Sequence, residues 1–174
     1  MLHFLYFFEM FTIFVYLISN NKLINLKIKY VHTNITASDW KKLSGFYIDV
    51  FDCKPLLPRR DQKGKWLDKG TGVNNAHIEG MHLQLPGFDE TGPTLEIYEY
   101  SKIIRSERSH ANKQGYGHIA FHTDKIEFVL KKALDKGASQ VGEMSQQFID
   151  GVGMLTFIYI SDPEGYLIEL QNWS

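Results

Sequence analysis

The sequence has almost no cysteine and no block of like charge. Its one cysteine, Cys53, has no partner within the chain for a disulfide or for a thiolate zinc site. The hydrophobic core alone must therefore hold the fold together, which fits a reducing compartment and predicts a cytoplasmic protein. Nineteen Lys and Arg stand against twenty Asp and Glu, and no run of like charge is longer than a pair. Because a phosphate backbone needs a concentrated basic surface, we expect no nucleic acid partner.

The chain also lacks a long apolar run that is free of charge. The first nineteen residues are apolar and rich in aromatics, but Glu9 stands in the middle of them. An acidic residue at the centre of a spanning helix costs roughly 2.5 to 3.5 kcal/mol, and no Lys or Arg precedes the run as in a secretory signal. Three interpretations stay open: a weak membrane anchor, a disordered or docked extension, and a start site placed upstream of the true one. We favour the last two over the anchor and expect no membrane partner.

A strand followed by a helix occurs twice after this extension, which covers residues 1–26 and is not expected to be part of the fold. Apolar and polar residues alternate from Ile28 to Ala37, and an amphipathic helix capped by Asp39 follows. The alternation returns over residues 116–122, and the helical spacing returns over residues 126–134. Three further strand-like runs follow each helix. The sequence therefore predicts an α+β fold for a single domain over residues 27–174, built from two βαβββ modules at residues 27–100 and 115–174.

Two polar segments interrupt this pattern. Residues 58–75 are rich in Lys, Gly and Asp and are predicted to form a loop over the first module. Its cations are expected to face solvent, with contact to an anionic substrate tail as the alternative: Arg59, Arg60, Lys63 and Lys65. Residues 101–114 are mostly polar and charged and are predicted to link the modules.

A histidine and a glutamate recur at matching positions of the two modules. His32 and His118 stand in the first strand of each module, on the face away from its helix. Glu96 and Glu169 stand in the last strand, each inside an otherwise apolar run. Any one of these residues alone is typical of an ordinary strand position. A buried carboxylate is costly unless it is paired or binds a metal, so the coincidence of all four favours a shared metal site.

Five motifs resemble those of the vicinal oxygen chelate superfamily. They are Tyr30-Val-His-Thr-Asn-Ile, Phe46-Tyr-Ile-Asp-Val-Phe, Thr94-Leu-Glu-Ile, Gly117-His-Ile-Ala-Phe and Asp162-Pro-Glu-Gly-Tyr-Leu-Ile-Glu-Leu. This superfamily includes glyoxalase I, methylmalonyl-CoA epimerase, fosfomycin resistance proteins, extradiol dioxygenases and bleomycin-binding proteins. The resemblance covers nearly all of residues 27–174. It implies a curved eight-stranded mixed sheet around one metal cleft, with His32, Glu96, His118 and Glu169 as metal ligands.

The implied ligands narrow the chemistry. Imidazole and carboxylate without thiolate suit a divalent ion such as Zn, Ni, Co, Mn or Fe. Four protein ligands leave two open positions on an octahedral ion, where a substrate with two neighbouring oxygens can chelate and the carbon beside its carbonyl becomes more acidic. The resemblance to glyoxalase-like enzymes implies that Glu169 moves the proton, with Glu96 as a second base in an epimerase-like mechanism. Fosfomycin resistance proteins and dioxygenases use two His and one Glu, so Glu96 argues against both.

We therefore expect a glyoxalase-like lyase or isomerase that acts on a small-molecule substrate; a homodimer is compatible with this function. The substrate stays open. Thr36 and Tyr100 stand where glutathione-using glyoxalases carry Arg and Asn, which argues against a glutathione hemithioacetal and leaves an acyl-CoA, another thiol adduct or a small hydroxy-ketone. The alternative function is a metal-silent protein that binds a small molecule, like the bleomycin-binding relatives.

The remaining histidines are predicted to be structural or exposed: His3, His77, His82, His110 and His122. Among them His122 shares a strand face with His118 and is the first further candidate for the site.

Overall fold

The structure, a computed structural model, describes residues 27–105 and 109–174. The chain divides into two compact units, Met1–Tyr30 and Val31–Ser174, and every helix and strand described here belongs to the second unit. The predicted extension over residues 1–26 lies outside the described residues and stays a prediction. No helix within the described ranges is both long enough and apolar enough to span a membrane.

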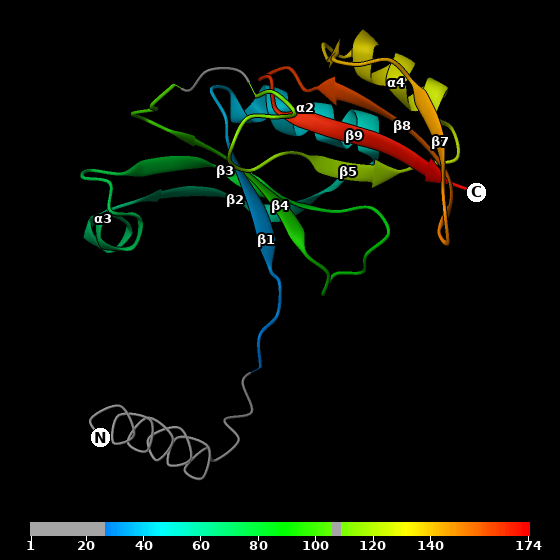
Figure 1. The fold of residues 1–174 in the computed structure, drawn as a ribbon. Helices are drawn as coiled ribbons and strands as arrows, with labels where there is room; N and C mark the ends of the chain where they lie inside the picture. Colours follow the sequence, from blue (N-terminus) through cyan, green and yellow to red (C-terminus); the bar gives the residue numbers. More distant parts are fainter. Residues whose placement is uncertain (1–26, 106–108) are drawn as a thin grey trace, which may run out of the picture. The chain divides into compact units, whose positions relative to one another are not determined.

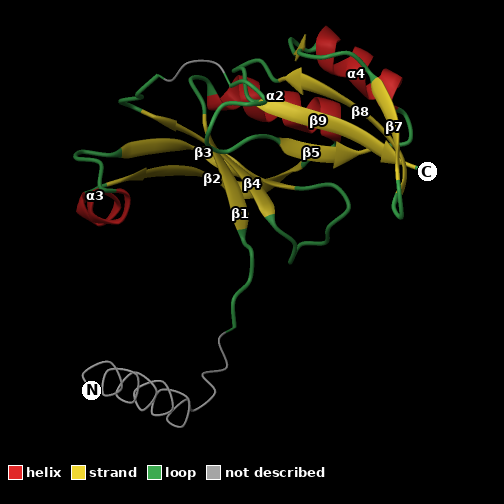
Figure 2. Ribbon diagram, in the orientation of Figure 1, coloured by secondary structure: helices red, strands yellow, loops and turns green. Residues whose placement is uncertain are grey.

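Each half of the second unit follows the predicted βαβββ order with one added element, a short helix in the first half and a further strand in the second (Figures 1 and 2). The first half contains β1 (His32–Thr36), α2 (Trp40–Phe51), β2 (Lys54–Lys63), α3 (Lys65–Thr71), β3 (His77–Gln84) and β4 (Thr94–Tyr100). The second half contains β5 (Ile119–His122), α4 (Ile126–Asp135), β6 (Ser139–Gln140), β7 (Ser145–Ile149), β8 (Gly153–Ser161) and β9 (Leu167–Trp173). The α+β fold of two modules is therefore confirmed.

The strands form two mixed sheets, where one curved sheet of eight strands was expected. Their orders are β1-β4-β3-β2 and β5-β9-β8-β6, with β7 also paired to β8. In each sheet the first strand of the module runs parallel to its last strand, and the other pairs are antiparallel. The strands β1 and β5 are edge strands of different sheets, and each pairs with a single neighbouring strand.

The predicted loop over residues 58–75 is wrong, because strand β2 continues to Lys63 and helix α3 follows. Two prolines, Pro55 and Pro58, suggest an early end to this strand. The strand accommodates them because it lies at the edge of its sheet and its register shifts between Leu56 and Arg60. The cations of this segment therefore lie on an edge strand and a short helix.

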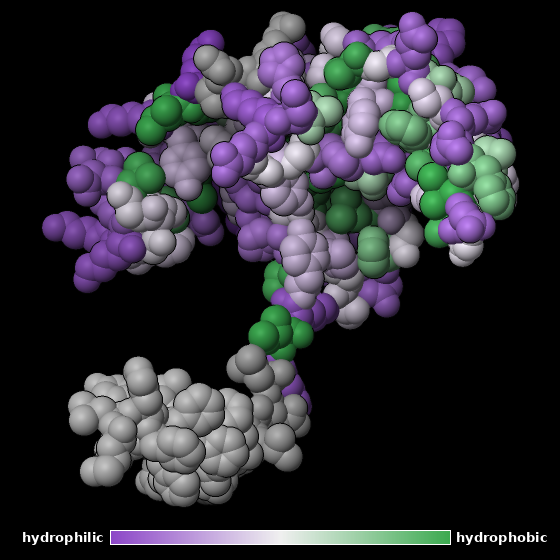
Figure 3. Space-filling model, in the orientation of Figure 1, coloured by the Kyte–Doolittle hydropathy of each residue, from purple (hydrophilic) through white to green (hydrophobic). Residues whose placement is uncertain are grey.

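The two long helices pack against a common core. The predicted stripe of α2 is buried, and Asp39 caps this helix by accepting a hydrogen bond from the backbone N–H of Lys42 at 2.9 Å. In α4 Ile126 and Ala133 are buried, while Leu134 at the end of the predicted stripe is 39% exposed. Hydrophilic residues cover much of the face of the second unit in Figure 3, where hydrophobic residues form small groups.

A buried polar contact joins the two modules. The Tyr47 hydroxyl, from α2, donates to the Asp162 carboxylate, from the turn before β9, at 3.0 Å. The same carboxylate accepts the backbone N–H groups of Glu164 and Tyr166, at 2.9 and 3.0 Å. Burial raises the pKa of Asp162 from 3.8 to about 6, although these hydrogen bonds lower it. The turn is further tied to the first module by the Tyr166 hydroxyl, which donates to the carbonyl of Thr36 at 2.7 Å.

A chain shortened to begin at Leu26 is predicted to fold as the full chain does. All the helices and strands described above begin at His32 or later, and termini that are not tied into a fold tolerate removal. Thermal unfolding should give the same melting temperature for both chains, and their metal contents should be equal. Loss of folding in the shortened chain would show instead that the aromatic segment packs on the domain.

Candidate metal and proton-transfer site

Strand register places the two histidine–glutamate pairs in equivalent positions. Glu96 on β4 lies opposite Asn34 on β1, and Glu169 on β9 lies opposite Ala120 on β5. His32 stands two residues before Asn34, within β1, and His118 stands two residues before Ala120, directly before β5 and not in it as the sequence predicted. Because residues i and i+2 share one face of a strand, each histidine lies diagonally beside its glutamate on the same face. The repeat seen in the sequence is thus reproduced in the pairing of the strands.

The side chains within each pair are in contact. The Nε2 atom of His32 lies 3.3 Å from Oε2 of Glu96, and the Nε2 atom of His118 lies 2.9 Å from Oε2 of Glu169. Both glutamates are largely removed from water, with side chains 11% and 13% exposed. A carboxylate in such surroundings needs a charged or hydrogen-bonding partner, which the imidazole supplies.

The structure does not gather all four residues around one point. Within residues 27–105 and 109–174 no group of three or more His, Cys, Asp or Glu is arranged to hold a metal ion. A contact between their neighbours lies close to both pairs: Oγ1 of Thr33, beside His32, lies 3.5 Å from the hydroxyl of Tyr116, two residues before His118. The first strands of the two modules therefore approach each other near their histidines.

Taken separately, each pair has donor atoms of a type and spacing that a divalent ion accepts. Ligand atoms that lie about 2.0 to 2.2 Å from an ion, at right angles to each other, are about 3 Å apart. The nitrogen–oxygen separations of 3.3 and 2.9 Å within the two pairs match this spacing. Nitrogen and oxygen ligands without sulfur suit the divalent transition metals predicted from the sequence.

His82 belongs to the site, although the sequence placed it among the structural or exposed histidines. It lies opposite Glu96 in the β3–β4 pair, with its Nε2 atom 3.0 Å from Oε1 of Glu96 and 2.9 Å from the Tyr98 hydroxyl. Its position between the buried residues Met81 and Leu83 indicates a side chain that points away from the helix. That alternation is visible in the sequence, but the register that brings His82 to Glu96 is not.

Charged and polar neighbours tune this first-module cluster. Burial lowers the pKa of His82, and the charges of Arg60 and His32 lower it further against the opposite effect of Glu96. Burial and the Glu96 charge raise the pKa of Tyr98, while a hydrogen bond from Arg60 lowers it. Arg60 therefore faces the cluster, which corrects the expectation that it lies on a solvated loop.

The second-module pair has a different third member. Tyr159 on β8 lies opposite Glu169, where the first module has His82. Burial, together with the charge of Glu169 and a hydrogen bond to it, raises the pKa of Tyr159. The Tyr159 ring also meets the His118 ring edge-on, at 5.0 Å between centroids. His122, the further candidate from the sequence, is exposed at the end of β5.

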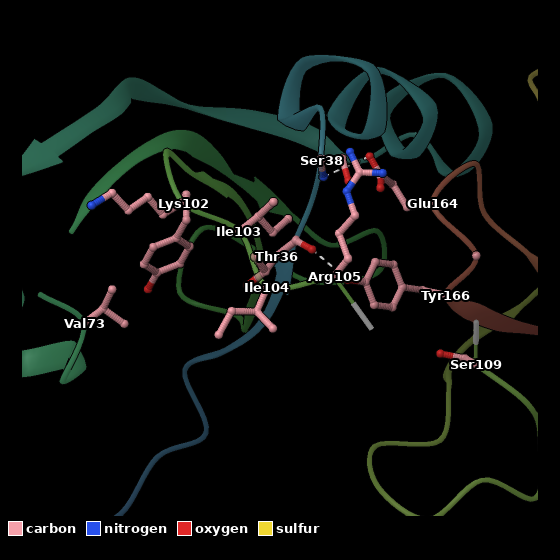
Figure 4. A pocket seen from close by; sticks show the side chains of 12 residues that line it. Thr36, Ser38, Val73, Lys102, Ile103, Ile104, Arg105, Ser109, Glu164 and Tyr166 are labelled. Carbon is pink, nitrogen blue, oxygen red and sulfur yellow. Dashed lines mark hydrogen bonds between the residues drawn. The ribbon is translucent and has the colours of Figure 1, made fainter. Parts of the chain in front are cut away.

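A cavity of about 550 Å³ lies further along the strands that carry the first pair. Its wall includes Thr36 and Tyr100, each four residues after His32 or Glu96 on the same strand face, which is about 13 Å along an extended chain. Figure 4 shows the Arg105 side chain extending toward Glu164, with Lys102 on the opposite side of the cavity. The Glu164 carboxylate itself accepts the backbone N–H groups at the start of α2.

The model of the Glyoxalase/Bleomycin resistance protein/Dioxygenase superfamily matches residues 29–170. The chain belongs to this superfamily. The match spans both modules and confirms the resemblance to the vicinal oxygen chelate superfamily drawn from the sequence motifs. No curated protein matches the chain significantly.

Solved structures of this superfamily share the fold. A glyoxalase family protein from Bacillus cereus superposes with a TM-score of 0.66 at 22% identity, over 88% of this chain and 97% of that protein. A glyoxylase/bleomycin resistance protein/dioxygenase domain from Frankia sp. EAN1pec gives 0.52 at 14% identity, over 86% and 93%. The fosfomycin resistance protein FosX from Listeria monocytogenes gives 0.52 at 15% identity, over 85% and 94%. At these identities the likeness concerns the fold alone.

Proposed function

We propose that this superfamily member is a metal-dependent lyase or isomerase that moves a proton beside a carbonyl of a small-molecule substrate. The observation that carries the proposal is the matched pair of contacts, His32 with Glu96 and His118 with Glu169, at the same register of two repeated modules. A structural ion pair needs no repetition, whereas a site shared by two halves requires a contribution from each. The cytoplasmic location and the homodimer stay predictions.

In this proposal a divalent ion is held by His32, Glu96, His118 and Glu169. When bound, the ion supplies positive charge that stabilises the negative charge developing on two neighbouring oxygens of the substrate. The chain supplies the proton transfer itself. Glu169 is the proposed base, with Glu96 as the second candidate. Both carboxylates are largely removed from water, so few water molecules compete with the substrate for their oxygens.

The cavity supports a substrate with a tail. It begins about 13 Å from the first pair along the strands, and its wall offers Lys102 and Arg105 beside the apolar side chains Ile103 and Ile104. An acyl thioester or another thiol adduct with an anionic end fits this wall better than a small hydroxy-ketone does. Neither Thr36 nor Tyr100 has a guanidinium group that could bind a carboxylate through two hydrogen bonds, so we do not propose glutathione as the thiol.

A metal-silent binding protein is the second candidate function, because the cavity would serve a bound molecule without any reaction. The separation of the two pairs in the described residues favours it. The matched ligand chemistry of the pairs favours the enzyme, since simple sequestration does not need two nearly buried glutamates that each contact a histidine. Metal content is the observation that separates the two functions.

The protein purified without chelator is predicted to carry about one divalent ion per chain, measured by mass spectrometry. His32→Ala combined with His118→Ala should abolish the loading, because one nitrogen ligand is lost from each module. His77→Ala is the matched control: His77 pairs with Asp61 at 2.7 Å, apart from the two proposed pairs, and should leave the loading unchanged. Full loading of the double variant would overturn the ligand assignment.

A further inference from the structure

The two equivalent glutamates do not have equivalent neighbours. Glu96 faces a histidine across the antiparallel strand pair, His82, whereas Glu169 faces Tyr159. The two modules match in strand order, in parallel pairing and in the diagonal histidine. The replacement of a phenol by an imidazole is therefore a specific break in the internal symmetry, located at the carboxylates themselves.

Both oxygens of Glu96 are engaged. Oε1 lies 3.0 Å from Nε2 of His82, and Oε2 lies 3.3 Å from Nε2 of His32 and 3.4 Å from Nδ2 of Asn34. The residue as a whole is 8% exposed. The Nε2 atom of His82 thus lies in direct contact with Oε1 of Glu96, while its hydrogen bond is with the Tyr98 hydroxyl.

His82 is itself held in place. The Tyr98 hydroxyl lies 2.9 Å from its Nε2 atom, and Arg60 hydrogen-bonds to the same hydroxyl. The Tyr98 ring packs beside Gly80, where a Cβ atom would collide with the backbone carbonyl of Ile97 and come within 2.5 Å of the ring. A glycine at this point of β3 thus lets the ring lie where its hydroxyl reaches His82.

Glu169 has one contact fewer than Glu96 among the described residues. The Nε2 atom of His118 lies 2.9 Å from its Oε2, and Tyr159 forms a hydrogen bond with it. The residue opposite it on β5, Ala120, has no side-chain donor in place of Asn34. Glu96 therefore has three side-chain partners, whereas Glu169 has two.

We propose that His82 is a positioning residue that holds Glu96 in place beside His32 as a ligand. The inference rests on the proposed function and extends it by adding a residue outside the proposed ligands that orients Glu96. His82 acts through Glu96: it occupies Oε1 and keeps Oε2 beside His32.

Binding of Co²⁺ or Zn²⁺ alone, measured by competition with a chelating dye, tests the proposal. His82→Leu, which has no donor, should bind the ion about 10- to 100-fold more weakly than the parent. His82→Gln, which offers an amide N–H to Oε1, should recover most of the affinity. His77→Leu, on the same strand but paired to Asp61, is the matched control and should bind as the parent does. Equal affinity of His82→Leu and the parent would overturn the proposal.

A second variant covers the case in which His82→Leu fails to fold. Tyr98→Phe keeps the ring on Gly80 and removes only the hydroxyl that contacts His82. It should bind the ion more weakly than the parent and more tightly than a folded variant without the His82 donor. Affinity equal to the parent's would contradict the role given to His82.

A parent protein that binds no ion would contradict the proposed metal site, but it would not test the contact between His82 and Glu96. That contact is then tested in the presence of a chelator, by a double-mutant cycle of His82→Leu and Glu96→Gln that is read from urea unfolding midpoints. The double variant should lose less than the sum of the two single losses, because both remove the same contact. Additive losses would overturn the positioning role even without a metal.

Discussion

We expect Glu169→Gln to lower the rate of substrate proton exchange by a factor of roughly 10² to 10⁴, the range typical for loss of a general base, and to leave much of the metal bound. The amide oxygen can still coordinate an ion, but the amide cannot take a proton at neutral pH. The measurement is exchange of the α-hydrogen with deuterium in heavy water, followed by NMR. The candidate substrates to screen are 2-methyl acyl thioesters, hemithioacetals and 2-hydroxy-ketones. Exchange is detected on the substrate itself, so the product need not be known.

Glu96→Gln is the matched control for this experiment. If Glu96 serves as the fixed ligand, its amide variant should lose more metal affinity than Glu169→Gln does, because His82 no longer faces a charged acceptor. Exchange by Glu169→Gln at the rate of the parent would place the base elsewhere and make Glu96 the first residue to test. A parent that binds a candidate tightly and exchanges none of them would favour the metal-silent binding protein.

We expect Asp162→Ala to lower the free energy of unfolding by about 3 to 5 kcal/mol, the cost typical of leaving several buried polar groups without a partner. Asp162 is 2% exposed and accepts the Tyr47 hydroxyl and the backbone N–H groups of Glu164 and Tyr166. The alanine variant leaves these three donors buried and loosens the contact between the modules. Urea unfolding at neutral pH measures the loss, and a loss below about 1 kcal/mol would contradict this role for Asp162.

Asp162→Asn is the control, because its amide oxygen still accepts the two N–H groups and its amide nitrogen can donate to Tyr47. The asparagine variant also has no carboxyl group at this position that could gain or lose a proton. The pKa of Asp162 is raised from 3.8 to about 6 in the folded state, so this group contributes stability that is fully present below pH 3.8 and is lost as the pH rises through about 6. The parent should therefore lose about 3 kcal/mol relative to Asp162→Asn between pH 3.8 and 7. Parallel stability curves would show that the carboxyl has an ordinary pKa.

Much of the fold could be predicted because short-range sequence patterns indicate its helices and strands. The alternation before Ala37 and the apolar stripe of α2 are short-range periodicities, and their return in the second half indicated the repeat that the structure contains. The segment after Pro58 was misjudged for the same reason. Its composition is that of a loop, and only its place at a sheet edge, with a shifted register, allows a strand with prolines there.

Part of the candidate site could likewise be predicted from local patterns, and part of it could not. Residue type and repeat position were enough to single out His32, Glu96, His118 and Glu169, because alternation along a strand assigns each side chain to a face without any knowledge of its neighbours. Which side chains meet across strands depends on register, and register is set by the packing of distant segments around a shared core. That is why the contact of His82 with Glu96, from strands joined by a nine-residue connection, and the different neighbour of Glu169 emerged only in the folded chain.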